Sequence, residues 1–209
     1  MRVMGLDLSL RATGVAVMDR AGDGMDFRTW LIRQPKASNV EERTERLVHM
    51  AEKVLDIFEE QKPDLIVIEA PAKGQKYQGA AIGEIHGVIR VQLFLAFGRH
   101  PLVKESSEMR KAVIGKIERS YEVVEGKKGK KKRSITYGMV PGKRGMKRAT
   151  IKDIIEQRLK ERGMSFDSQD EMDAYVAARY GWDVLLPTIG CAVDDQSKED
   201  NRRTESGMG

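Results

Sequence analysis

Cysteine and histidine are scarce in this chain of 209 residues, which contains only Cys191, His49, His86 and His100. A single cysteine excludes a disulfide within the chain, and histidines so widely scattered do not form a pattern of zinc ligands. We therefore interpret each histidine as a surface or packing residue.

Long apolar runs are also missing. No stretch approaches the roughly 18 apolar residues that a membrane-spanning helix needs, and the N-terminus lacks the charged and then apolar pattern of a signal peptide. Hydrophobic residues make up 40% of the chain, which is ordinary for one globular domain with a core. We therefore expect a cytoplasmic protein without a membrane partner.

Acidic residues are absent from residues 126–148, which hold ten of the 37 lysines and arginines. The rest of the chain has 27 basic and 32 acidic residues, so this segment alone makes an otherwise acidic protein basic. Concentrated positive charge favours a polyanion, because Lys and Arg release counterions from a phosphate backbone. A solvated loop or a nuclear-localisation signal is the alternative. Residues 134–140 can form a strand, so we predict a basic hairpin that binds DNA. Its basic residues are Lys127, Lys128, Lys130, Lys131, Lys132, Arg133, Lys143, Arg144, Lys147 and Arg148.

Four acids stand where strands end or a helix begins. Asp7 lies in the apolar run at the N-terminus, and Glu69 ends a second apolar run just before Pro71, so both runs read as core strands. Asp170 and Asp173 open a segment whose apolar residues recur at helical spacing. Because they are three residues apart, these two acids share one helix face.

Acids in these places can converge on one point, where they would repel one another unless cations compensated them. Hard oxygen ligands select Mg²⁺ or Mn²⁺ over zinc. Taken singly, Glu69 could cap a strand and Asp170 could be a helix N-cap. The combination of four acids favours a site for divalent metals.

The chain resembles the RuvC family of Holliday-junction resolvases, in the RNase H-like superfamily, over roughly residues 1–182. The resemblance rests on four segments, GLDLS at 5–9, TGVAV at 13–17, IVIE at 66–69 and DEMDA at 170–174. It implies an α/β, RNase H-like fold with a mixed five-stranded sheet flanked by helices. It also implies a homodimeric, Mg²⁺-dependent endodeoxyribonuclease that hydrolyses phosphodiesters in four-way or other branched DNA. A phage version of such an enzyme would act in the host cytoplasm.

The same resemblance implies a set of site residues. Two Mg²⁺ ions per active site, with Mn²⁺ as an alternative, would be bound by Asp7, Glu69, Asp170 and Asp173. The family's basic residues correspond to Arg110 or Lys111 and to Lys147 or Arg148, and we assign the catalytic role to Lys147. Tyr77 is the nearest match to an aromatic residue that stacks on an unpaired base. Tyr77 could also simply pack at the start of its helix.

Periodicity and turn residues predict the order of elements. We expect an antiparallel meander with strands at 2–8, 13–19 and 25–32, further strands at 64–69 and 101–105, and helices at 40–61, 78–97, 107–115, 149–162 and 170–182. In the helix at 78–97, Gly79, Gly83 and Gly87 form a nearly bare face that packs on the sheet or on a second copy of the chain. Residues 1–191 should form the nuclease domain with a basic insertion at 116–147, and residues 192–209 a disordered tail.

Two other functions fit parts of this pattern. An ATP-binding domain of the actin-like class also uses a phosphate-binding hairpin resembling residues 7–14, but such proteins usually need two such domains, for which the chain is short. A non-catalytic DNA-binding module would keep the fold without the chemistry, and the presence of all four acids argues against it. Within the nucleases, flaps, replication forks and RNA–DNA hybrids are alternative substrates.

Overall fold

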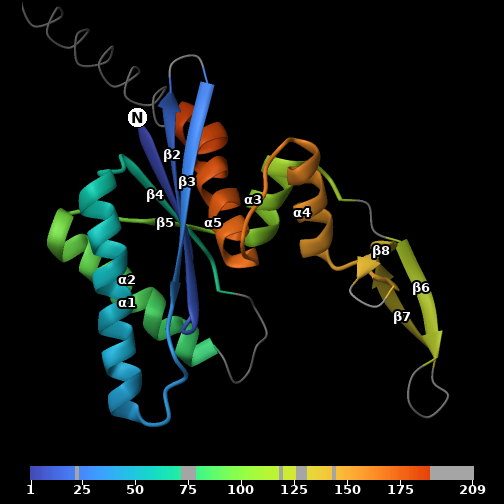
Figure 1. The fold of residues 1–209 in the computed structure, drawn as a ribbon, viewed down its shortest axis with the longest axis horizontal. Coiled ribbons are helices and arrows are strands. Elements are labelled where there is room, and N and C mark those ends of the chain that lie inside the picture. Colours follow the sequence, from blue (N-terminus) through green and yellow to red (C-terminus); the bar gives the residue numbers. More distant parts are fainter. Residues whose placement is uncertain (22–23, 72–78, 118–119, 126–130, 143–144, 189–209) are drawn as a thin grey trace, which may run out of the picture.

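The computed structural model describes residues 1–21, 24–71, 79–117, 120–125, 131–142 and 145–188 (Figure 1). Its centre is a five-stranded mixed sheet in the order β3-β2-β1-β4-β5. The pairs β1–β2 and β2–β3 are antiparallel, whereas β1–β4 and β4–β5 are parallel. The predicted fold class is confirmed. The strands are β1 Arg2–Asp7, β2 Ala12–Ala21, β3 Gly24–Arg33, β4 Leu65–Glu69 and β5 Leu102–Lys104.

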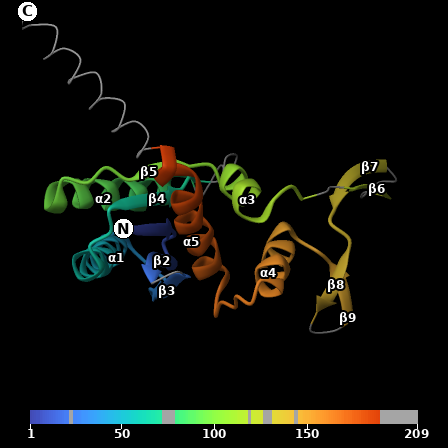
Figure 2. The same ribbon diagram turned by 90° about the horizontal axis from the view of Figure 1, so that it is seen from above.

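Helices cover both faces of this sheet. Figure 2 shows α1 and α2 on one side and α5 on the other, with α3 and α4 leading outward from α5. The first face packs α1 and α2 against residues such as Met4 and Leu6, and the second packs α5 against residues such as Val3 and Ala16. The helices are α1 Val40–Gln61, α2 Gly79–Phe97, α3 Ser106–Ile114, α4 Ile151–Glu161 and α5 Gln169–Tyr180, and a π-helix, Gly181–Leu185, follows α5.

The basic insertion forms two antiparallel hairpins between α3 and α4. The hairpin strands are β6 Ser120–Glu125, β7 Lys131–Thr136, β8 Met139–Gly142 and β9 Gly145–Arg148. The strand predicted at 134–140 is divided at Gly138, whose φ of +88° lies in the left-handed region that favours glycine. Both hairpins project away from the body of the protein (Figure 1).

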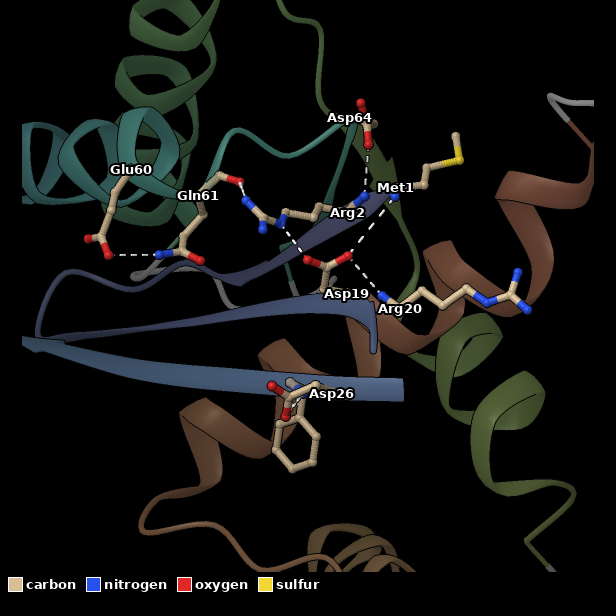
Figure 3. Close-up of polar contacts among 9 residues, drawn as sticks. Met1, Arg2, Asp19, Arg20, Asp26, Glu60, Gln61 and Asp64 are labelled. Carbon is tan, nitrogen blue, oxygen red and sulfur yellow. Dashed lines mark hydrogen bonds and ion pairs between the residues drawn. The ribbon is translucent and has the colours of Figure 1, made fainter. Parts of the chain in front are cut away.

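An ionic cluster holds the start of β1 at the end of the sheet remote from Asp7 (Figure 3). The Arg2 guanidinium donates to Asp19 Oδ2 at 2.6 Å and to the Gln61 carbonyl at 2.8 Å, and the Arg2 backbone N–H donates to Asp64 Oδ2 at 2.8 Å. These bonds join β1 to β2 and to the connection between α1 and β4. Asp19 lies within β2, which continues to Ala21, two residues beyond the predicted end of this strand.

Gly83 and Gly87 of α2 pack against no part of the chain that the structure describes. A Cβ atom built on Gly83 or Gly87 would meet nothing within 4 Å. Close packing of these two glycines on the sheet is therefore ruled out. No helix in the part of the chain that the structure describes is long and apolar enough to cross a bilayer.

Candidate active site

Strand alternation directs Asp7 and Glu69 to the same face of the sheet. In β1, Val3 belongs to the core beneath α5 and Leu6 to the core beneath α1, so Asp7 falls on the α5 face. In β4, Val67 belongs to the α5 core, which places Glu69 on that face as well. The two strands are parallel neighbours, so both acids emerge at the same edge of the sheet.

Two glycines let α5 approach this face unusually closely. A Cβ atom on Gly5 would lie 2.1 Å from the Ala174 carbonyl oxygen, and one on Gly14 would lie 2.0 Å from the Asp170 carbonyl oxygen. Backbone atoms cannot yield to such overlaps, so only glycine permits this contact between helix and sheet. Gly14 pairs with Asp7 across the β1–β2 ladder. The start of α5 is therefore held beside Asp7.

The N-terminus of α5 is capped by Ser168, whose hydroxyl accepts from the Glu171 N–H at 3.1 Å. Asp170 is therefore not the N-cap and is left available to the site. Glu171, the acid next to it, is engaged elsewhere, because Thr29 and Ser168 donate to its carboxylate at 3.1 Å and 2.8 Å. Asp173 is buried, with 1% of its surface exposed.

Two basic side chains compensate the buried Asp173. Arg110, from α3, donates through Nη2 to Asp173 Oδ1 at 3.0 Å and lies 3.4 Å from Glu69 Oε1. Lys152, from the first turn of α4, places its Nζ 2.5 Å from Asp173 Oδ2. An unpaired buried carboxylate would be strongly destabilising. Arg110 and Lys152 thus supply the positive charge that the folded chain needs around its acids.

The carboxylates still perturb one another. Burial, followed by the neighbouring Glu69 and Asp173 carboxylates, raises the pKa of Asp7 to about 8. Burial and then Asp173 raise the pKa of Glu69, against the opposing effect of Arg110. Burial is also the main cause of the raised pKa of Asp170, and Asp173 adds to it. Each of these acids thus lies close enough to another to oppose its ionisation.

The donor chemistry at this site suits a hard divalent cation, because all four acids offer carboxylate oxygens and a bound cation would oppose the repulsion that raises the pKa of Asp7. Within the residues that the structure describes, no three Asp, Glu, His or Cys side chains are already arranged as a metal site. Arg110 and Lys152 already bond to two of the carboxylates, Arg110 to Asp173 and Glu69 and Lys152 to Asp173. The acids fit a metal by donor type, and a bound ion would compete with these two cations for Asp173 and Glu69.

The structure separates the predicted basic residues. Arg110 joins the carboxylates, whereas Lys111 is exposed. Lys147 is not with the carboxylates, because its ammonium group pairs with Asp153 at 2.7 Å. Arg148 ends β9 and is exposed. The strand β7 contains Lys131, Lys132 and Arg133, whereas Tyr77, Lys127, Lys128, Lys130, Lys143 and Arg144 lie outside the described residues.

Lys152 is the site residue that sequence reasoning missed. Its position follows from the capping box of α4, in which the Thr150 hydroxyl accepts from the Asp153 N–H and the Asp153 carboxylate accepts from the Thr150 N–H. This box makes Ile151 the first helical residue and turns Lys152 toward Asp173. Although burial opposes it, the hydrogen bond with Asp173 raises the pKa of Lys152, so the side chain stays charged. The Thr-x-x-Asp spacing was the available signal.

Comparison with known proteins identifies a similar fold among solved structures but no related sequence family. No protein-family model matches the sequence, and no curated protein matches it. Among solved structures, the chain is similar to Thermus thermophilus RuvC in complex with a Holliday junction substrate, with 15% identity and a TM-score of 0.59 over 86% of this chain and 92% of that chain. A second Thermus thermophilus RuvC structure gives 16% identity and a TM-score of 0.58 over the same shares. The chain therefore has the fold of these RuvC structures.

Proposed function

We propose that this protein is a divalent-metal-dependent endodeoxyribonuclease that resolves four-way or other branched DNA junctions. The observation that carries the proposal is the gathering of Asp7, Glu69, Asp170 and Asp173 at one edge of a RuvC-like sheet, with Arg110 and Lys152 among them. A merely structural core has no use for four acids that oppose one another's ionisation. Such clusters are characteristic of functional sites.

Each side chain has a role that follows from its place. The four carboxylates would hold two Mg²⁺ ions, or Mn²⁺, with Asp7 central because Glu69, Asp170 and Asp173 all act on it. Bound divalent ions supply an activated water and stabilise the leaving oxygen in phosphodiester hydrolysis. Lys152 remains charged and reaches the same carboxylates, so its ammonium group would offset the charge that builds up on the phosphate oxygens. We propose Lys152 for this role in preference to Lys147, whose ammonium group pairs with Asp153.

DNA would reach this site through the two hairpins of the insertion. They connect α3 and α4, which carry Arg110 and Lys152, and they project from that side of the protein (Figure 1). Their basic residues would follow the phosphate backbone, which gives affinity without base specificity. This proposal extends to Lys111 and Arg148, which are exposed on the same part of the chain.

We further propose that the protein acts as a homodimer that associates through α2. This helix exposes Val91, Phe94 and Leu95 by 55%, 47% and 70%, and Gly83 and Gly87 leave open space beside its backbone. Apolar residues gathered on one helix commonly mark an interface. Substituting Leu95→Arg should convert a dimer to a monomer, as measured by analytical ultracentrifugation, whereas an unchanged mass would exclude this surface.

The function is tested by incubating the purified protein with Mg²⁺ and labelled four-way junction, flap, duplex and RNA–DNA hybrid side by side. Paired symmetric nicks in the junction are the expected result. Preferred cleavage of the flap or the hybrid would support nuclease activity but would identify a substrate other than the four-way junction. Hydrolysis of ATP without nicking would favour the actin-like alternative, and binding without cleavage would favour a non-catalytic module.

A further inference from the structure

A basic groove lies beside the β1–β2 turn, which follows the strand that ends at Asp7. It consists of two adjoining pockets of about 370 Å³ and about 400 Å³ that share Leu10, Ala37 and Arg46. The first pocket is also lined by Arg11 and Lys36. We call this combined hollow the Arg11 groove. It runs between the β1–β2 turn and the first turns of α1.

The lining of the Arg11 groove contains basic residues and no acid. Arg11 and Lys36 are exposed, and within the described chain neither side chain has an ion-pair partner. Arg46 Nη1 donates to the Pro35 carbonyl at 2.8 Å, and Arg43, in the second pocket, pairs with Glu84 at 2.6 Å. Within the described chain, the Arg11 and Lys36 side chains therefore lack both a hydrogen-bond and an ion-pair partner in a concave surface, which is the arrangement that attracts a polyanion.

The Arg11 groove adjoins the end of the strand that carries Asp7. Ser9, which lines it, is two residues beyond Asp7, and the Arg11 carbonyl accepts from the Gln34 N–H at 2.8 Å, which fixes the turn against the end of β3. In both views α1 and the hairpins lie on opposite sides of α5 and α4 (Figures 1 and 2). Asp170 and Asp173 thus belong to an element, α5, that lies between α1 and the hairpins.

We propose that the Arg11 groove binds the phosphate backbone of a DNA duplex arm while the hairpins hold the DNA on the far side of α5. This inference rests on the proposed nuclease function and adds a second contact surface to it. Two surfaces on either side of α5 would fix which phosphodiester lies over the carboxylates. One surface alone would leave the DNA free to pivot.

The test is the salt dependence of binding to a labelled four-way junction, measured in a metal chelator so that no cleavage occurs. The variant Arg11→Ser with Lys36→Ser removes the two cations without partners. The matched control, Arg20→Ser with Arg28→Ser, removes two exposed cations of the β2–β3 ladder, one near its opposite end and one near its middle. Each lost phosphate contact lowers the slope of log affinity against log salt by about 0.9, so two contacts lower it by about 1.8. A slope lowered by about 1.8 means that the Kd of the variant rises about 60-fold relative to wild type at about 0.1 M salt. This ratio is referred to about 1 M salt, where the phosphate contacts no longer contribute.

The inference is supported if the salt slope of the groove variant is lower by this amount and the control has the wild-type slope. The charge-preserving variant, Arg11→Lys with Lys36→Arg, should also have the wild-type slope. Lys36→Ser alone, in a segment without regular secondary structure, should give about half the change and serves as a second test should the double variant unfold early. Equal salt slopes in wild type and groove variant, or equal decreases in groove variant and control, would refute DNA binding by the Arg11 groove. Neither result would contradict the proposed nuclease activity. A wild-type protein that neither binds nor nicks junctions would overturn both.

Discussion

Asp7→Asn should stabilise the protein in the absence of divalent metal and abolish cleavage in its presence. Burial and the carboxylates of Glu69 and Asp173 raise the pKa of Asp7 from 3.8 to about 8. In the unfolded chain Asp7 loses its proton at a lower pH than in the folded chain. Between the two pKa values the folded state therefore holds the extra proton, and the stability of the fold decreases as pH rises. Asparagine has similar size and no charge, so it removes that penalty.

The magnitude follows from the difference in pKa between the folded and unfolded chain. A difference of about four pKa units corresponds to roughly 6 kcal/mol above pH 8. The neighbouring acids share protons with Asp7 and carry part of this energy, so we expect about 3 kcal/mol for Asp7→Asn near pH 8 and about 1 kcal/mol or less near pH 5. A gain of about 3 kcal/mol in a chain of this length raises Tm by about 6 to 12 °C.

The assay is urea or thermal unfolding in a metal chelator at about pH 5, pH 7 and pH 9. The two proteins should differ little at the lowest pH and most at the highest. Adding Mg²⁺ should stabilise wild type more than Asp7→Asn, because a bound ion relieves the same repulsion and needs the charge. Parallel pH profiles for the two proteins, or equal stabilisation by Mg²⁺, would refute the placement of Asp7 in a buried acidic cluster.

Three further outcomes are expected. Lys152→Ala should lower the nicking rate of junction DNA by about 10², and Lys147→Ala should lower it much less; the reverse order would return the catalytic role to Lys147. Gly14→Ala should lower the free energy of unfolding by about 1 to 3 kcal/mol, because its Cβ meets the Asp170 carbonyl; unchanged unfolding would show that the helix does not approach so closely. Deleting residues 126–142 should weaken binding to DNA of every shape and flatten its salt dependence between about 50 and 200 mM salt, whereas an unchanged slope would mean that the hairpins are only solvated.

The fold was predictable because its signals are local. One apolar run that contains Asp7 and another that ends in Glu69 predicted the two strands that lead to the site, and the burial of these strands in the structure agrees with that pattern. The helix predicted at 40–61 has those bounds because Asn39 caps its start by accepting from the Glu42 N–H. Such features depend on neighbours in the sequence, so no knowledge of tertiary contacts was needed.

The basic residue of the site was harder to predict because it depends on helix register after a long insertion. Lys147 and Lys152 are both near the start of α4, and only the capping box at Thr150 decides which one faces Asp173. The orientation of Gly83 in α2 was undecidable for another reason. A bare helix face has the same sequence whether it packs on its own sheet or on another molecule, so only tertiary structure could show that it faces open space.

The two cations of the site also connect it to the insertion. Arg110 lies on α3 and Lys152 on α4, and the hairpins form the only covalent path between these helices. Asp173 is buried, so a motion of α3 and α4 that withdrew both Arg110 and Lys152 would be costly unless another positive charge took their place. If the hairpins bind DNA as proposed, the force that DNA exerts on them acts on the helices that neutralise the acids. DNA binding and metal binding would then be coupled through the same two side chains.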